Sequence, residues 1–299
     1  MKRLFSSLLM AVAIGLTATS AYAADVQNDN EGKYTIKNGQ MTMVIDANKG
    51  GKILSLKYDD KEVISQMRWP ETFGSTFWTS PQKEWNWPPV PEYDKKPYEV
   101  KQEGDVLTMT SGINERLKYS IRKEFATDEK DKAFVITYYI INESDETRQV
   151  APWEITRVPN DASLIFFDAP VDSIWPAGLM NFQSANGISW YQPDEANDNR
   201  KVNADGQGWL AYCNKGNGLL LVKRFDNLDA SQPAPGEAEI QVYVNRGKTY
   251  IELESQGTYT TLQPKEKLSW TVCWYLQPCE GTPTPSEALL QQVRHILGN

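Results

Sequence analysis

The strongest constraint in the sequence is the alternation of apolar and polar residues in short runs between residues 34 and 275. Alternation with a period of two is typical of strands with one buried face, and turn residues between such runs are typical of all-β chains. The clearest runs are 34–36, 41–45, 53–56, 106–109, 117–125, 133–141, 164–167, 219–225, 240–244, 250–253 and 268–275. This spacing predicts about twelve to sixteen strands in two large stacked sheets.

The end of the chain changes from the strand period to the helical one. Residues 284–287 read Thr-Pro-Ser-Glu, which is a capping-box spacing with proline at the first helical position. Apolar residues then recur at helical spacing, at Leu289, Leu290, Val293, Ile296 and Leu297. We expect one short C-terminal helix that lies against the sheets.

The first 23 residues have the order of a secretory signal peptide. A basic start at Lys2 and Arg3 precedes the apolar residues 4–16, and small residues end at Ala23. The apolar stretch is shorter than the roughly 20 residues that cross a bilayer. We therefore expect cleavage after Ala23, a single mature domain at 24–299, no membrane insertion of the mature chain, and a periplasmic or secreted location.

Charge and cysteine content limit the partners of the mature chain. The sequence has 31 basic and 39 acidic residues, a net charge of −8, which argues against binding to nucleic acid. Three cysteines, Cys213, Cys273 and Cys279, leave at least one thiol unpaired. Cys273 is expected in the core, and a Cys273–Cys279 bridge is the alternative. Cys-x5-Cys without a nearby histidine is a poor zinc pattern, and no metal or cofactor is expected.

Residues 67–98, called here the aromatic segment, are dense in tryptophan and proline and are expected to form a long ordered loop. Sugar rings pack C–H faces on indole, and their hydroxyls need planar polar partners. Trp78, Trp85 and Trp87 alternate here with polar residues such as Gln82. The segment therefore fits a wall of a sugar site, and a structural lid over the sheet edge is the alternative.

Two strands carry the candidate carboxylates. Glu154 lies between the apolar neighbours Trp153 and Ile155, and Arg157, at odd spacing, tends toward the opposite face. Glu252 and Glu254 share the parity opposite to that of their apolar neighbours. The alternative for each glutamate is a solvent-exposed strand position.

Three separated stretches resemble the galactose mutarotase-like superfamily. Residues 50–56, Gly-Gly-Lys-Ile-Leu-Ser-Leu, are similar to its opening strand, and Glu254-x-Gln256 with 262–266 is similar to its closing segment. Residues 75–82 and 252–270 resemble a bacterial family of secreted proteins within it. The resemblance implies an all-β supersandwich with a sugar site on a concave face, with Glu254 as the base and Gln256 beside it.

The general acid is where the sequence departs from mutarotases. That superfamily places a histidine on a central strand, which corresponds by order to residues 150–157, but the one histidine here is His295, in the predicted C-terminal helix. Histidine supplies a proton near neutral pH, and Glu154 could do so only with a raised pKa. This departure puts the ordinary mutarotase reaction in doubt.

The sequence favours a carbohydrate-active protein that acts on or binds a sugar or oligosaccharide. An enzyme would use Glu154 and Glu254 as acid and base in epimerisation or glycoside cleavage, with carboxyls about 5 to 9.5 Å apart. The alternatives are a non-catalytic sugar-binding module and a structural accessory with a vestigial cleft. The predicted ligand-binding side chains are Trp78, Gln82, Trp85, Trp87, Trp153, Arg157 and Gln256.

Overall fold

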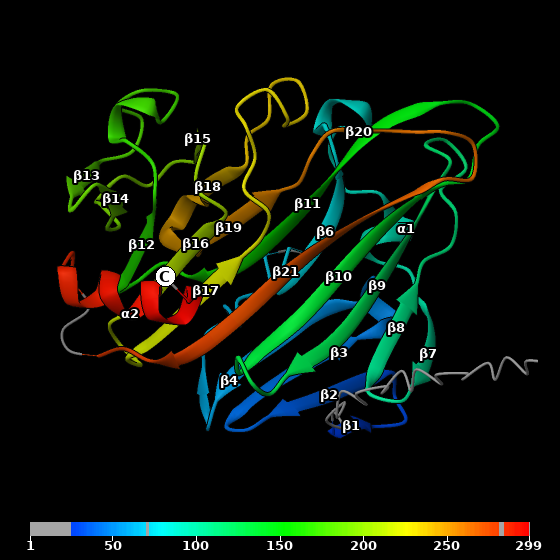
Figure 1. Ribbon diagram of the computed structural model, residues 1–299, viewed down its shortest axis with the longest axis horizontal. Coiled ribbons are helices and arrows are strands. Elements are labelled where there is room, and N and C mark those ends of the chain that lie inside the picture. The colour runs from blue at the N-terminus through cyan, green and yellow to red at the C-terminus, as the bar shows by residue number, and fades with distance from the viewer. Residues whose placement is uncertain (1–24, 70–71, 281–283, 299) are drawn as a thin grey trace, which may run out of the picture.

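The computed structural model describes residues 25–69, 72–280 and 284–298, which form two large antiparallel sheets stacked on each other (Figure 1). The predicted signal peptide lies outside these residues. Within the described ranges, no helix is long and apolar enough to cross a membrane.

The first sheet carries the candidate site. Its strands are β1 (Asp25–Asn28), β2 (Lys33–Asn38), β3 (Met41–Asp46), β4 (Lys52–Tyr58), β5 (Lys61–Glu62), β6 (Ser75–Ser80), β11 (Arg148–Pro159), β15 (Arg200–Ala204), β18 (Ile240–Val244), β19 (Tyr250–Gln256) and β20 (Thr260–Leu262). Their order is β1-β2-β3-β4-β6-β11-β19-β18-β15, with β5 paired to β4 and β20 paired to β11. The sheet is thus built from strands far apart in the chain.

The second sheet covers one face of the first. Its strands are β7 (Glu99–Glu103), β8 (Val106–Thr110), β9 (Tyr119–Asp128), β10 (Ala133–Asn142), β12 (Ser163–Phe167), β13 (Phe182–Ala185), β14 (Ile188–Tyr191), β16 (Trp209–Asn214), β17 (Leu219–Arg224) and β21 (Lys267–Pro278). Their order is β13-β14-β12-β16-β17-β21-β10-β9-β8-β7. The main apolar core lies between the sheets, which confirms the predicted two-sheet sandwich.

The strand count exceeds the prediction because several strands are buried on both faces. β6, β14 and β16 have no exposed position, so they lack the alternation that identifies a half-buried strand. The aromatic segment shows the same effect. It was predicted as a loop, which was wrong for its middle: β6 lies in the first sheet between β4 and β11.

The short helices are η1 (Ala47–Lys49), η2 (Gln82–Glu84), α1 (Pro91–Asp94), η3 (Val171–Ser173) and η4 (Arg246–Lys248).

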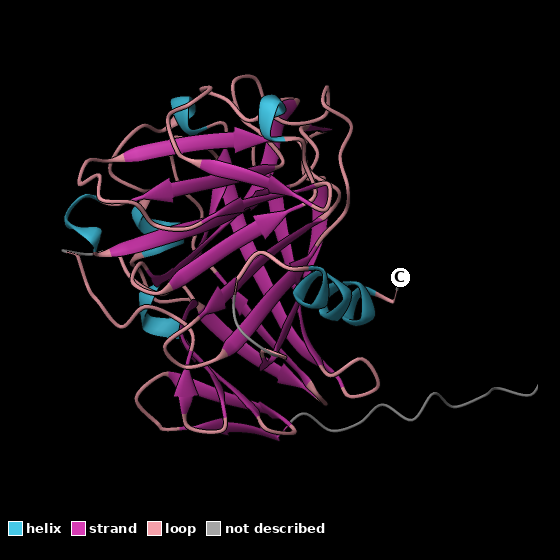
Figure 2. Ribbon diagram, turned by 90° about the vertical axis from the view of Figure 1, so that its left-hand side faces the viewer, coloured by secondary structure: helices cyan, strands magenta, loops and turns pink. Residues whose placement is uncertain are grey.

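The predicted C-terminal helix is confirmed as α2 (Glu287–Leu297), which lies outside the strands (Figure 2). Its side chains Leu289, Leu290 and Val293 are buried in a second apolar cluster with residues of the second sheet. The cap differs from the prediction. Ser286 is the N-cap, and its hydroxyl accepts a hydrogen bond from the backbone N–H of Leu289.

The cysteine pairing also differs from the alternative considered from sequence. Cys213 and Cys279 form a disulfide, and Cys273 is free. Cys273 lies on β21 and Cys279 just follows it, so six residues of extended chain separate them, about 20 Å at roughly 3.3 Å per residue. That separation excludes a bridge between Cys273 and Cys279.

Candidate functional site

Polar side chains line up across β11, β19, β18 and β15 on the face of the first sheet that points away from the second. Arg157 is opposite Glu252, Glu252 is opposite Tyr243, and Tyr243 is opposite Lys201. Residues directly opposite each other in antiparallel strands share a face. Glu254, two residues after Glu252, has the same parity. This face, called here the site face, is the one that strand parity predicted for Glu254.

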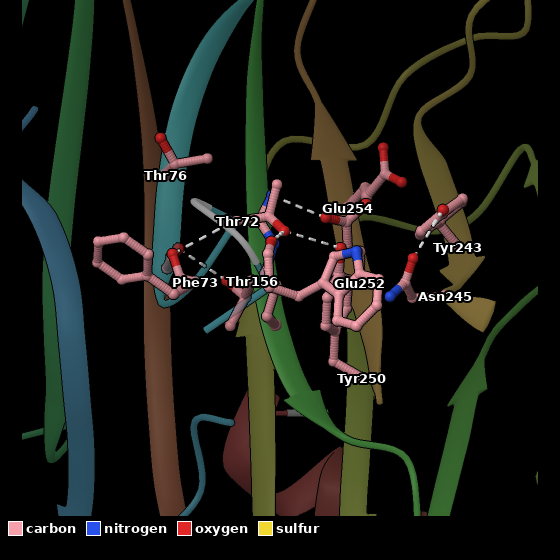
Figure 3. Close-up of polar contacts among 12 residues, drawn as sticks. Thr72, Phe73, Thr76, Thr156, Tyr243, Asn245, Tyr250, Glu252 and Glu254 are labelled. Carbon is pink, nitrogen blue, oxygen red and sulfur yellow. Dashed lines mark hydrogen bonds and ion pairs between the residues drawn. The ribbon is translucent and has the colours of Figure 1, made fainter. Parts of the chain in front are cut away.

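A pocket of about 650 Å³ opens on this side of the molecule, between the aromatic segment, the turn before β15 and the turn that joins β18 to β19. Its lining residues are Trp69, Thr72, Trp87, Pro88, Pro89, Asp94, Lys95, Asn199, Tyr243, Asn245, Arg246 and Tyr250. Trp69 and Trp87 are 42% and 61% exposed. Figure 3 shows Tyr243, Tyr250 and Asn245 gathered near Glu252. We call it the aromatic pocket, since it combines exposed indole with hydroxyl and amide groups.

A buried ion pair lies next to this pocket. The Arg157 guanidinium Nη2 is 2.7 Å from Glu252 Oε1, and its Nη1 donates to the carbonyl of Phe73 at 3.3 Å. Burial lowers the pKa of Arg157, but the nearby Glu252 and other groups raise it, and the net shift of the pKa is upward. The guanidinium also lies 5.6 Å from the ring of Tyr250. Arg157 therefore stays charged and holds Glu252 against the pocket lining.

Glu254 lies in a more enclosed part of the site face and is 1% exposed. Its Oε2 accepts a hydrogen bond from the Trp153 indole at 2.8 Å and is 2.9 Å from the Lys201 ammonium. Burial raises the pKa of Glu254 to about 7; Lys201 lowers it, and Glu252 raises it further. The carboxyl thus titrates near neutrality. It is covered by Lys201, which also lies 4.6 Å from the Trp153 ring, and is absent from the pocket lining.

Asp94 anchors the aromatic segment to the sheet. Its Oδ2 is 2.8 Å from the Lys52 ammonium, and its Oδ1 accepts from Thr76 at 2.8 Å and from the Trp78 indole at 3.0 Å. Burial would raise the pKa of Asp94, but Lys52 and these donors bring it below its ordinary value. The carboxylate is therefore ionised and fully committed to partners, which fixes one wall of the pocket.

The predicted tryptophans divide into two groups. Trp87 lines the pocket. Trp78, Trp85 and Trp153 are buried behind it, with ring centroids 5.4 Å apart for Trp78 and Trp85 and 5.3 Å for Trp78 and Trp153. The Trp85 indole donates to the carbonyl of Thr79 at 2.8 Å. These three residues support the wall rather than presenting a free ring face to a ligand.

Of the two predicted glutamines, Gln256 ends β19 and Gln82 begins η2. Ser80 donates to the Gln256 side-chain oxygen at 2.6 Å, and the Gln256 amide donates to Glu237 at 3.2 Å. Glu237 also accepts from the backbone N–H of Gln82 at 3.1 Å. Neither glutamine lines the aromatic pocket. Together they join the aromatic segment to the loop before β18.

Glu154 does not share the site face with Glu254. Its Oε2 is 2.5 Å from the Lys223 ammonium, and its Oε1 accepts from the Tyr138 hydroxyl at 2.7 Å and the Trp274 indole at 3.0 Å. All three partners belong to the second sheet, and Glu154 is 0% exposed. In the register of β11 with β19, the two glutamates have opposite parities. The predicted acid–base pair across one sugar therefore does not fit this geometry.

Sequence reasoning missed most of the pocket lining. Tyr243 had a signal, because its alternation with Val242 and Val244 assigns it to the polar face of β18. Arg246 and Asn199 had none, because they come from separate turns that the fold brings together. His295 lies on α2 and lines a different pocket of about 800 Å³. No group of three or more His, Cys, Asp or Glu side chains among the described residues is arranged to hold a metal ion.

Solved structures similar to this chain include galactose mutarotase-like and epimerase proteins. The galactose 1-epimerase from Lactobacillus acidophilus has a TM-score of 0.55 at 13% identity, over 86% of this chain and 98% of that one. Galactose mutarotase-like proteins from Clostridium acetobutylicum and Lactobacillus casei have TM-scores of 0.56 and 0.55 at 10% and 13% identity. They cover 86% and 82% of this chain, and 99% and 100% of their own. No family model and no curated protein matches the sequence. Such identities show the fold alone, and they confirm the fold that the resemblance implied.

Proposed function

We propose that this chain, which has the galactose mutarotase-like fold, binds a sugar in the aromatic pocket of its first sheet. The observation that carries the proposal is the combination of two exposed tryptophans, Trp69 and Trp87, with hydroxyl and amide groups in one pocket. The C–H faces of a sugar ring pack on indole, and its hydroxyls need polar partners.

The pocket supplies both donors and acceptors for sugar hydroxyls. The Tyr243 hydroxyl donates to Asn245 Oδ1 at 3.1 Å, and the hydroxyls of Tyr250 and Thr72 are 3.1 Å apart. Burial raises the pKa of Tyr243, and the nearby Glu252 raises it further. The phenol therefore stays protonated at neutral pH and remains a donor. Fixed hydroxyls beside exposed rings favour recognition of a sugar over binding of a purely apolar ligand.

A second candidate is proton transfer on a bound sugar, as in an aldose epimerase. It is favoured by one observation, the pKa of about 7 that burial gives Glu254, because a general base works best when its pKa is near the operating pH. The carboxyl lies beneath Lys201 and outside the pocket lining, so a sugar would have to displace the lysine. Binding needs no such movement and is the function that the geometry supports best.

We also propose that the protein meets its sugar outside the cytoplasm, because residues 1–23 have the order of a signal peptide. The test is the mass of the exported protein. A product that begins at Ala24 is expected, and an exported product that retains residues 1–23 contradicts the proposal.

The binding proposal is tested with a glycan array, followed by titration calorimetry of the sugars retained on it. Trp87→Ala should weaken binding about tenfold or more, equal to about 1.4 kcal/mol, because it removes a stacking surface. Trp175→Ala is the matched control, since Trp175 is 42% exposed but does not line the pocket. Absence of any sugar binding, or equal losses in both variants, contradicts the proposal. Mutarotation measured by polarimetry with Glu254→Gln as the blank tests the second candidate.

A further inference from the structure

Arg246 is held in a fixed turn at the edge of the aromatic pocket. It begins η4, and its backbone N–H donates to Asn199 Oδ1 at 2.8 Å. The next residue, Gly247, donates its N–H to Asn197 Oδ1 at 2.8 Å. The Arg246 guanidinium lies 5.9 Å from the Trp69 ring, and the side chain lines the pocket. The backbone is therefore pinned on both sides, and the charged end is placed beside an exposed indole.

The carboxylates around the aromatic pocket already form ion pairs with cations other than Arg246. Among the described residues, the carboxylates of Asp94, Glu252 and Glu254 lie at or beneath the pocket and pair with Lys52, Arg157 and Lys201, respectively. The Arg246 guanidinium, by contrast, has no ion pair and no side-chain hydrogen bond with any other residue in the described ranges. The chain as a whole carries a charge of −8. Arg246 thus faces the pocket of an acidic protein without a counterion among the residues that the structure describes.

We infer that the sugar bound in the aromatic pocket carries an anionic oxygen group, and that Arg246 binds this group. The guanidinium is planar and always charged, and it presents paired N–H donors that match the two oxygens of a carboxylate or phosphate. Trp69 and Trp87 would hold the ring while Arg246 holds the anion at the pocket edge. A uronic acid, a sugar phosphate and a sugar sulfate all provide this chemistry. The inference rests on the proposed sugar binding and adds the class of sugar.

The experiment compares pairs of sugars that differ at C6, where one member carries an anionic group. Calorimetry with the mature chain measures glucuronate against glucose, galacturonate against galactose, and glucose 6-phosphate and glucose 6-sulfate against glucose. Each anionic sugar that fits should bind at least about tenfold more tightly than its neutral partner. The carboxylate, phosphate and sulfate arms identify which anion the pocket takes.

Arg246→Gln should remove this preference, weakening the anionic sugar about tenfold or more and the neutral one by less than about twofold. Arg246→Lys keeps the charge without the paired donors and should retain part of the preference. Lys248→Gln is the matched control, because it removes the same charge two residues away, where Lys248 pairs with Glu195 at 2.8 Å outside the pocket. It should leave all affinities unchanged. Thermal unfolding of each variant shows that it is folded.

Two results overturn the inference but leave the proposed function standing. One is a pocket that binds neutral sugars as tightly as anionic ones, with Trp87→Ala weakening both. The other is an equal loss of affinity in Arg246→Gln and Lys248→Gln, which would show a long-range charge effect in place of contact. Failure of every sugar to bind overturns the proposed function together with the inference.

Discussion

Glu154 and Glu254 are the same residue type on neighbouring paired strands, and both are buried, yet their surroundings differ in kind. Glu154 faces the second sheet and has three partners there, Lys223, Tyr138 and Trp274. Glu254 faces the other way and has two, Trp153 and the partly exposed Lys201. The first is enclosed on all sides by the core. The second pairs with a lysine whose side chain is 31% exposed.

Burial by itself does not identify a functional carboxylate, since both glutamates are buried. Burial alone penalises the charged form of both groups. In the core, burial lowers the pKa of Lys223 and the neighbouring Glu154 raises it. The charge of Lys223 therefore depends on Glu154. On the site face, burial outweighs the help from Lys201 and brings the pKa of Glu254 to about 7. We therefore assign the core pair a structural role, whereas the pKa of about 7 lets the Glu254 carboxyl change its charge near neutral pH.

The greatest loss of stability should come from breaking the buried ion pair between Glu154 and Lys223. Glu154→Gln leaves the Lys223 ammonium buried without a counterion, which should lower the free energy of unfolding by about 3 to 5 kcal/mol. Urea denaturation measures the loss, and sugar binding per folded molecule should not change. Removing both charges in Glu154→Gln, Lys223→Met should recover much of the stability. A single variant as stable as the parent, or one that loses binding while fully folded, would contradict the structural role of Glu154.

The next effect separates the two kinds of tryptophan in the aromatic segment. Trp78→Ala removes a buried ring and a donor to Asp94, and should cost about 3 to 5 kcal/mol of unfolding free energy. Trp87→Ala removes an exposed ring and should leave stability nearly unchanged while weakening sugar binding. Denaturation and calorimetry on the same two preparations check both halves. If Trp87→Ala proves the more destabilising variant, the division into wall and ligand surface is wrong.

The third effect is a dependence of stability on pH. The pKa of Glu254 is higher in the folded protein, about 7, than in the unfolded chain, so between about pH 4.5 and 7 the folded state binds more protons. Stability from this group is therefore fully present below about pH 4.5 and falls by up to about 3 kcal/mol as the pH rises to 7. Glu254→Gln cannot titrate and should lose this part of the slope.

Denaturation curves from about pH 4.5 to 8 measure that slope in the parent and in Glu254→Gln. Glu239 also has a pKa raised to about 7 by burial, so the difference between the two proteins, and not the slope of either, reports Glu254. Identical slopes in both would contradict a raised pKa at Glu254.

Strand parity explains how much of the fold and site could be predicted from sequence. The alternation around Glu254 assigned it to the correct face, because a period of two follows directly from strand geometry. The strand β6 was missed since both of its faces are buried, and the Cys213–Cys279 disulfide depends on strand order, which composition does not reveal. Arg246 reaches the pocket through a tertiary contact with another turn. Patterns within a strand were thus readable, and contacts between distant segments were not.

The last prediction concerns Lys201, whose ammonium pairs with the Glu254 carboxylate. Lys201 lowers the pKa of the Glu254 carboxyl, so Lys201→Gln should raise that pKa further and extend the decline of stability to higher pH. Because the lysine is partly exposed, we expect a loss of only about 1 kcal/mol at about pH 8 and almost none at about pH 4.5, where the carboxyl is protonated in either protein. Lys248→Gln removes an equal charge from an ion pair away from Glu254. It should leave the dependence of the unfolding free energy on pH unchanged. If the pH at the midpoint of the stability decline falls or stays the same in Lys201→Gln, Lys201 does not control the charge of Glu254. Glu254 would then differ from Glu154 only in the face of the sheet on which it lies.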